Sequence, residues 1–193
     1  MSITPTRGVL LLSIIMLVYS CHKHNKTAKD TYENYIVGNK EWKSKKVSHS
    51  IDLLSYTATE VPIQYYILKN GSKKDHDSAY IASSRERIIE IEFEHQDGKD
   101  VLLEEFTRKA YEDSVKYMSF FIEKDFEVVT ESNDTIKCAG VNFERNYNVA
   151  PFKRILLYFN NINPNENIRL IYNDVLFGNG IIEFNFVEQP LKL

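Results

Sequence analysis

Hydrophobic and polar residues alternate along much of this chain with the two-residue period of β-strands. The clearest case is 87–94, where Ile89, Ile91 and Phe93 alternate with three glutamates. Other short runs of β-branched and aromatic residues are separated by turn-favouring clusters of Asn, Asp, Gly and Pro. We therefore predict further strands over the ranges 61–68, 126–130, 135–143, 154–159, 168–172 and 181–187.

Two of these segments carry more detailed predictions. Asp97-Gly98 is followed by the apolar run 101–103, and this pattern is typical of a β-hairpin after the strand 87–94. The run 155–159 is apolar at every position, so it should be a central strand that is covered on both faces.

One segment changes to a helical period. Tyr111, Val115, Met118 and Ile122 follow one another at spacings of three and four residues, which predicts a helix over about 108–124 with Thr107 as its cap. The expected fold is mainly β, with an antiparallel β-sandwich or a curled sheet and this one helix packed on it; an α+β fold is the alternative.

The beginning of the chain has a different character. The apolar run 9–18 is shorter than the roughly 20 residues of a membrane-spanning helix and fits the central part of a signal peptide. It ends in Val18-Tyr19-Ser20-Cys21, which resembles the lipobox of bacterial lipoproteins. The resemblance implies that residues 1–20 are removed, that acyl chains on Cys21 anchor the protein to a membrane, and that it lies in the cell envelope.

The segment after the cysteine is polar and shows no sustained periodicity. We predict a flexible, lipidated tether over 21–37 and a single β-rich domain over 38–193. No acidic residue follows directly behind Cys21, and in several lipoproteins of the Bacteroidota such residues mark export to the cell surface. By this resemblance the protein faces the periplasm, and its richness in Asn, Lys, Ile and Tyr is similar to proteins of that phylum.

Charge and cysteine content narrow the classes of partner and chemistry. The net charge is −3 without a basic cluster, which argues against a nucleic-acid partner. If Cys21 is lipidated, Cys138 has no partner for a disulfide. A lone thiol can be a nucleophile, but the alternation around Gly140 favours Cys138 as a small buried residue whose face continues as Val141 and Phe143 beyond a bulge.

Several polar groups are candidates for a site. The glutamates of 87–94 form a row that could bind a cation or a basic partner, although a solvated sheet face explains the same alternation and is favoured. The histidines at 22 and 24 and the segment 75–77 have no spacing typical of zinc or calcium sites. The chain also lacks the GxSxG, Walker and GxGxxG motifs. We expect no catalytic residues, metal or cofactor.

Aromatic residues near the later turns are the remaining clue. Either they form a recognition surface, because aromatic and arginine side chains are enriched at interfaces, or their rings simply close the ends of the sandwich. The candidates for such a surface are Tyr147, Phe152, Tyr172, Phe177 and Arg145. The favoured function is a lipid-anchored, non-enzymatic module that binds a protein partner, as an accessory lipoprotein of an envelope or secretion assembly. The alternative is a small-ligand-binding or hydrolytic lipoprotein, and a pocket rather than a flat aromatic patch would discriminate in its favour.

Overall fold

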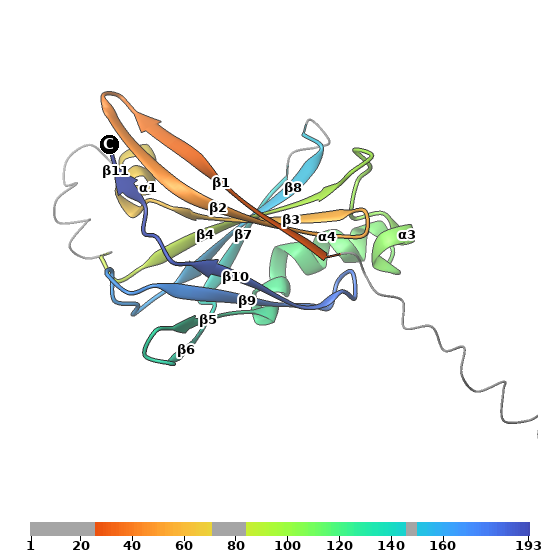
Figure 1. Cartoon of the computed structure of the whole chain (residues 1–193). Coiled ribbons are helices and arrows are strands. Elements are labelled where there is room, and N and C mark those ends of the chain that lie inside the picture. The colour runs from red at the N-terminus through yellow and green to blue at the C-terminus, as the bar shows by residue number, and fades with distance from the viewer. Residues whose placement is uncertain (1–25, 71–83, 146–149) are drawn as a thin grey trace, which may run out of the picture.

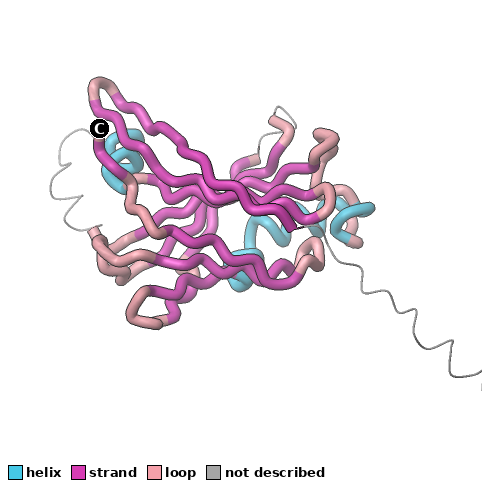
Figure 2. The backbone as a smooth tube through the Cα atoms, viewed as in Figure 1, coloured by secondary structure: helices cyan, strands magenta, loops and turns pink. Residues whose placement is uncertain are grey.

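The computed structural model describes residues 26–70, 84–145 and 150–193, and two antiparallel sheets pack face to face within them (Figure 1, Figure 2). The mainly β fold with few helices is therefore confirmed. The larger sheet has the order β1-β2-β3-β4-β8-β7, with β11 beside β2, and the smaller sheet has the order β10-β9-β5-β6. The strands are β1 (Lys26–Val37), β2 (Lys40–Ile51), β3 (Leu54–Val61), β4 (Arg87–His95), β5 (Phe126–Thr130), β6 (Thr135–Lys137), β7 (Gly140–Glu144), β8 (Phe152–Phe159), β9 (Ile168–Asp174), β10 (Gly180–Phe186) and β11 (Leu191–Lys192).

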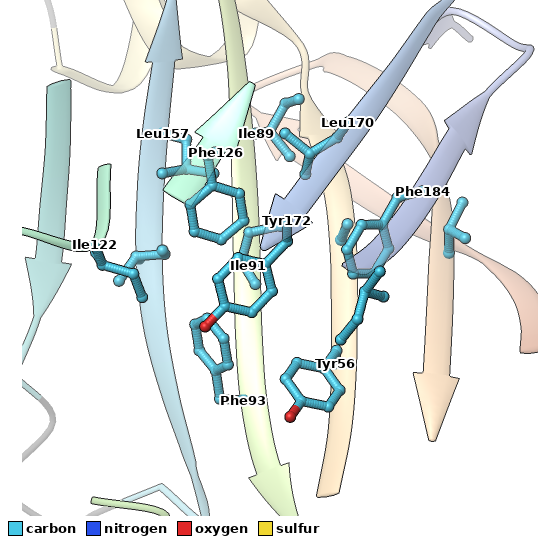
Figure 3. Packing of buried hydrophobic residues seen from close by; sticks show 14 of the residues in the cluster. Tyr56, Ile89, Ile91, Phe93, Ile122, Phe126, Leu157, Leu170, Tyr172 and Phe184 are labelled. Atoms are coloured by element: carbon cyan, nitrogen blue, oxygen red, sulfur yellow. The ribbon is translucent and has the colours of Figure 1, made fainter. Parts of the chain in front are cut away.

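The main hydrophobic core fills the space between the two sheets. Ile89, Ile91 and Phe93 of β4 point into it, as their alternation with glutamates predicts (Figure 3). From the smaller sheet, the ring of Phe126 stacks on Tyr172 with 4.3 Å between centroids. Strand β8 lies between β4 and β7 and is covered on both faces, which confirms the predicted central strand.

In the described ranges, four short helical segments complete the fold. Helix α4 (Tyr111–Phe120) and the 3₁₀ turn η2 (Ile122–Asp125) replace the predicted helix 108–124 and bury Met118 and Ile122 in the main core. Helix α3 (Glu104–Thr107) precedes them. Helix α1 (Ile63–Asn70) lies against the outer face of the larger sheet, meaning the face turned away from the smaller sheet, where it closes a second small core. No helix in the described ranges is long and apolar enough to span a bilayer.

The predicted flexible tether is wrong for 26–37, because these residues form β1. Strand β1 pairs with β2 along its whole length around a turn at Gly38-Asn39, where Gly38 has a φ of +61°. Both faces of β1 are largely polar, so no hydrophobic alternation marked it. Ion pairs between β1 and β2 contribute to this pairing instead of hydrophobic contacts; Lys45, for example, lies 2.9 Å from Asp30. The folded domain therefore includes 26–37, which the prediction had placed in the tether.

The segment 61–68 was predicted as a strand, and this is wrong beyond Val61. The chain leaves β3 at Pro62, whose carbonyl accepts a hydrogen bond from Tyr66 N at 3.0 Å and so starts α1. A strand would turn Tyr65 and Tyr66 to opposite faces. A helix lets both pack on the second core.

Two local predictions near α4 are also wrong. The turn at 97–98 forms, and Gly98 N donates to His95 O at 2.8 Å, but 101–103 makes no returning strand and leads into α3. The side chain of Thr107 does not cap α4, which begins after Ala110 without a side-chain cap. Thr107 instead hydrogen-bonds Ser114 at 2.8 Å between their hydroxyl oxygens.

The predicted strand 135–143 is divided between the sheets. Strand β6 pairs with β5 in the smaller sheet and β7 pairs with β8 in the larger sheet, so the chain changes sheets at 138–139. Cys138 N donates to Phe126 O, and Ala139 N donates to Tyr158 O in the other sheet. The predicted inward face is confirmed, because Ile136, Cys138, Val141 and Phe143 all pack against the main core.

Candidate functional site

A pocket of about 340 Å³ opens on the outer face of the larger sheet. Residues of β1, β2, β3, β4, β7, β8 and α1 line it. Helix α1 lies beside the β1–β2 hairpin (Figure 1). We call this hollow the outer-face pocket. Its lining includes the charged and polar side chains of Glu33, Tyr35, Lys46, Glu90, Glu92 and Arg154. Tyr65, Tyr66, Asn142 and Glu144 also line it.

Strand register brings these residues together from distant parts of the sequence. Lys46 of β2, Thr59 of β3 and Glu90 of β4 lie in one row across the sheet. Leu156 of β8 and Asn142 of β7 continue the same row. The next row contains Glu92, Arg154 and Glu144 in adjacent strands. Alternation therefore places one row of mixed polarity and one row of charges side by side on the pocket floor.

Two cations neutralise part of the acidic floor. Arg154 Nη2 donates to Glu92 Oε1 at 2.7 Å, and its Nη1 lies 3.5 Å from Glu144 Oε2. Lys46 Nζ lies 3.0 Å from Glu33 Oε2 and 3.7 Å from Glu92 Oε2. Glu92 is thus held by both cations, and its side chain is only 16 % exposed.

Glu90 is less well compensated than its neighbours. Its carboxylate lies 3.4 Å from Arg154 Nε, and that nitrogen makes no hydrogen bond with any described group. Burial raises the pKa of Glu90 to about 7; Glu92 and Glu144 add to the rise, while Arg154 and Lys46 oppose it. A carboxyl in this state is partly protonated at neutral pH and gains from any further positive charge.

Tyr35 brings an unsatisfied hydroxyl to the same pocket. Its side chain is buried, with 8 % exposure, and its hydroxyl has no hydrogen-bond partner among the described residues. Burial and the nearby charges of Glu90 and Glu33 raise its pKa, so the hydroxyl is neutral. Buried hydroxyls nearly always have a partner, and leaving one without costs about 1–3 kcal/mol. The side chains of Trp42 and Ser44, on the same face of the hairpin, also carry unpartnered buried atoms.

Aromatic rings of α1 form the end wall. The ring of Tyr65 meets that of Tyr35 edge to face at 4.9 Å, and Lys69 Nζ lies 5.4 Å from the Tyr65 ring centre. The hydroxyls of Tyr66 and Tyr158 are 3.0 Å apart, which ties the helix to β8. The pocket therefore combines a charged floor with an aromatic end, a combination suited to a small polar ligand.

The glutamate row was expected to be a solvated sheet face, and the structure corrects this for two of its members. Glu94 is exposed, but Glu90 and Glu92 line the pocket and are mostly buried. The alternation did show that Glu90 and Glu92 lie on one face of the strand. Local periodicity alone does not show that the hairpin and α1 cover this face.

The predicted aromatic recognition surface is not a single surface. Tyr172 is fully buried in the main core, so its assignment to a surface is wrong. Phe177 is half-buried, with its ring 5.9 Å from that of Phe93. Arg145 is exposed, and Tyr147 lies outside the described residues. Among the described members, only Phe152 contacts a residue of the pocket, because Arg154 lies over its ring at 4.9 Å.

Cys138 is not among the residues that line the pocket. The Cys138 thiol is half-buried and donates to Gly140 O at 3.1 Å, and burial raises its pKa. Cys21, the nearby histidines and the segment 75–77 fall outside the described residues. Within the described ranges, no three His, Cys, Asp or Glu side chains converge as metal ligands would. Tyr35 and Lys46 were missed, because the pairing around Gly38-Asn39 was not recognised.

No family model matches the chain. No curated protein sequence and no solved structure is significantly similar to it either.

Proposed function

We propose that this chain is a lipid-anchored protein of the bacterial cell envelope that binds a small polar ligand in the outer-face pocket. The observation that carries the proposal is the Tyr35 hydroxyl, which is buried, lines the pocket and lacks a partner among the described groups. A ligand that hydrogen-bonds this hydroxyl would remove the cost of its desolvation. A pocket with convergent polar groups was the feature expected of a small-ligand protein.

The anchor is supported by the lipobox-like residues Val18 to Cys21. Strand β1 begins at Lys26, so five residue steps separate the modified cysteine from the folded domain. These steps span at most about 17 Å, which would hold the domain close to the membrane. Two or three acyl chains make such anchoring stable.

Binding rather than catalysis is proposed because every pocket glutamate except Glu90 is already held by a cation, so no second acid is free to act with Glu90. Glu92 is held by Arg154 and Lys46, and is therefore not free as a nucleophile or base. Glu33 is also paired with Lys46. Ion pairs of this kind position a ligand without supplying a reactive group.

The test is a thermal-shift screen of the detergent-solubilised full chain against water-soluble small molecules. We expect several compounds to raise the Tm, because a ligand that binds the native state stabilises it by mass action. Asn142→Trp should abolish these shifts, since the exposed Asn142 lines the pocket and a large ring there would fill it. Asn185→Trp, at an exposed position in the smaller sheet, is the matched control and should keep them. Shifts that survive equally in Asn142→Trp, or no shift with any compound, would refute the proposal.

A protein partner is a second proposal, supported by a different surface. Ile36, Leu191 and Leu193 are each about 60 % exposed near the C-terminal end of the chain, where Leu193 N donates to Glu41 O beside the β1–β2 hairpin. Exposed apolar side chains that gather in this way are typical of interaction sites. Co-purification of one envelope protein with the wild type, and its loss when all three are changed to Ser, would support this second function; equal recovery from both would contradict it.

A further inference from the structure

We propose that the ligand of the outer-face pocket is an organic cation with a primary ammonium group, which is held between the Glu90 carboxylate and the Tyr35 hydroxyl. This inference rests on the proposed function and specifies its ligand class. Both groups line the pocket, and each has unused hydrogen-bonding capacity among the described residues. An ammonium group can donate three hydrogen bonds, so it can serve a carboxylate and a hydroxyl oxygen together.

The resident cations leave Glu90 as the open acceptor. Arg154 places its best hydrogen bond on Glu92, and it approaches Glu90 only at 3.4 Å through Nε. That Nε has no hydrogen-bond partner among the described groups, so the pair is a contact of charges and not a hydrogen bond. Lys46 is drawn towards Glu33 at 3.0 Å. A cationic ligand could therefore bind the Glu90 carboxylate, which accepts no hydrogen bond from Arg154 Nε and is not paired with Lys46.

The charge balance of the lining also selects a cation. Four glutamates and three basic side chains line the pocket, and the third base, Lys69, lies over the Tyr65 ring near the rim. An anionic ligand would be repelled by Glu33, Glu90 and Glu92. A metal ion is disfavoured because no cluster of three acidic, histidine or cysteine ligands converges in the described ranges. An ammonium group tolerates such spread acceptors, because its donors need no fixed coordination geometry.

The aromatic end wall suits the rest of such a ligand. Tyr65 and Tyr66 of α1 line the pocket beside Tyr35, and their rings can cover a short carbon chain or attract a second cationic group. The volume of about 340 Å³ is at the small end of the range for ligand pockets, about 300–1,000 Å³. We therefore expect a short aliphatic or aromatic amine rather than a long polymer.

Binding of an ammonium group should depend on pH through Glu90. The groups facing it are Arg154 of β8, Glu92 of its own strand, Glu144 of β7 and Lys46 of β2. From β1, Tyr35 and Glu33 also lie close. Protonated Glu90 cannot balance a cation, so the ligand must bind the ionised form and release a proton. Affinity should rise with pH up to about 7 and then level off.

The experiment is isothermal titration calorimetry of the detergent-solubilised full chain with three probes of equal carbon number: 1,4-diaminobutane, 1,4-butanediol and succinate. We expect measurable affinity only for 1,4-diaminobutane, and an affinity at least about tenfold lower at pH 5 than at pH 8. Glu90→Gln should weaken binding at pH 8 at least about tenfold and remove the pH dependence. Tyr35→Phe should weaken it about threefold or more, the loss of one hydrogen bond.

Controls separate this inference from the proposed function. Glu94→Gln changes an exposed glutamate on the same face of β4 outside the pocket and should bind like the wild type. Circular dichroism must show that each variant folds, and Asn142→Trp, which blocks the pocket from an exposed position, should also lose the probe. If butanediol or succinate binds as well as the diamine, the ammonium assignment is overturned while the pocket remains a ligand site. If no probe binds and the thermal-shift screen yields only neutral or anionic ligands, the assignment is likewise overturned.

Discussion

The hydroxyl of Tyr56 in the larger sheet donates a 2.8 Å hydrogen bond to the Asp174 carboxylate in the smaller sheet, deep in the protein. Asp174 accepts three more hydrogen bonds, from the hydroxyl of Tyr172 and from the backbone N–H groups of Phe177 and Asn179. The Asn179 side chain donates to the Tyr56 oxygen at 2.6 Å. This network joins the two sheets across the edge of the aromatic core.

Tyr56→Phe should lower the free energy of unfolding by about 1–3 kcal/mol, because it removes one donor from a buried carboxylate and leaves the Asn179 amide without its acceptor. Chemical denaturation measures the difference. Tyr111→Phe is the matched control, since its hydroxyl bonds Asp100 at an exposed position and should contribute less than about 0.5 kcal/mol. Equal effects of the two changes would contradict the role given to the network.

Leu157→Ala should cost about 2–5 kcal/mol of stability, the range for truncation of a fully buried leucine. Leu157 lies in β8 between β4 and β7 and has no exposed surface. Ile181→Ala, at a position that is 62 % exposed in β10, is the control and should change stability little. A loss below about 1 kcal/mol for Leu157→Ala would show that β8 is not the packed centre of the core.

Glu90→Gln should change how stability depends on pH. The pKa of Glu90 is raised to about 7 from an ordinary value of 4.5, so the folded state binds its proton more tightly than the unfolded state does. Its contribution to stability is therefore complete below about pH 4.5 and is lost as the pH rises to about 7. The uncharged variant avoids this loss and should be more stable than the wild type at pH 8 by about 1–3 kcal/mol.

Urea unfolding at pH 4, 6 and 8 measures this difference. Asp125, whose pKa is raised to about 6 chiefly by burial, titrates alike in both proteins and therefore cancels in the comparison. Glu94→Gln, which removes an exposed carboxylate of the same strand, should follow the wild-type curve. Parallel curves for the wild type and Glu90→Gln would mean that Glu90 is ionised as readily as in water.

Cys21→Ser should release the protein from membranes. In the proposed anchor Cys21 is the acylated residue, and a hydroxyl oxygen could not replace its thioether sulfur. Fractionation of cells into membrane and soluble material checks this, and Ser2→Ala serves as a control change in the same N-terminal segment. Unaltered membrane partition of the Cys21 variant would exclude acylation as the anchor.

The Cys138 thiol should react slowly in the folded protein. It is half-buried and donates to Gly140 O, and burial raises its pKa, which lowers the fraction of reactive thiolate. In a Cys21→Ser background, iodoacetamide should label Cys138 at least about tenfold more slowly before denaturation than after it. Thr135→Cys together with Cys138→Ala supplies an exposed thiol on the neighbouring strand for comparison. Labelling of Cys138 as fast as that control would show that the sheet crossing is open to solvent.

The strands with one buried face could be read from the sequence, because alternation is a local consequence of a core on one side. β4, β5, β9 and β10 lie within about two residues of their predicted ranges, and β8 was recognised as central because it is apolar on both faces. The inward face around Cys138 was also predictable. Each of these properties depends on neighbours only a few positions apart in the chain.

Other elements depended on contacts that no local pattern contains. β1 is largely polar on both faces and exists because it pairs with β2. The segment after Pro62 has the composition of a strand and is a helix because both Tyr65 and Tyr66 find a core to pack on. The change of sheets at 138–139 follows from the positions of β5 and β8, which accept hydrogen bonds from successive residues there.

The candidate site shows the same division. The sequence by itself determined that Glu90 and Glu92 share one face of a strand, because side chains two residues apart in β-structure always do. Only the tertiary structure decided that this face is a pocket, since Tyr35, Lys46 and Arg154 reach it from strands far away in the chain. The raised pKa of Glu90 and the unpartnered hydroxyl of Tyr35 both result from removal of water, which requires the hairpin, β8 and α1 to assemble around them.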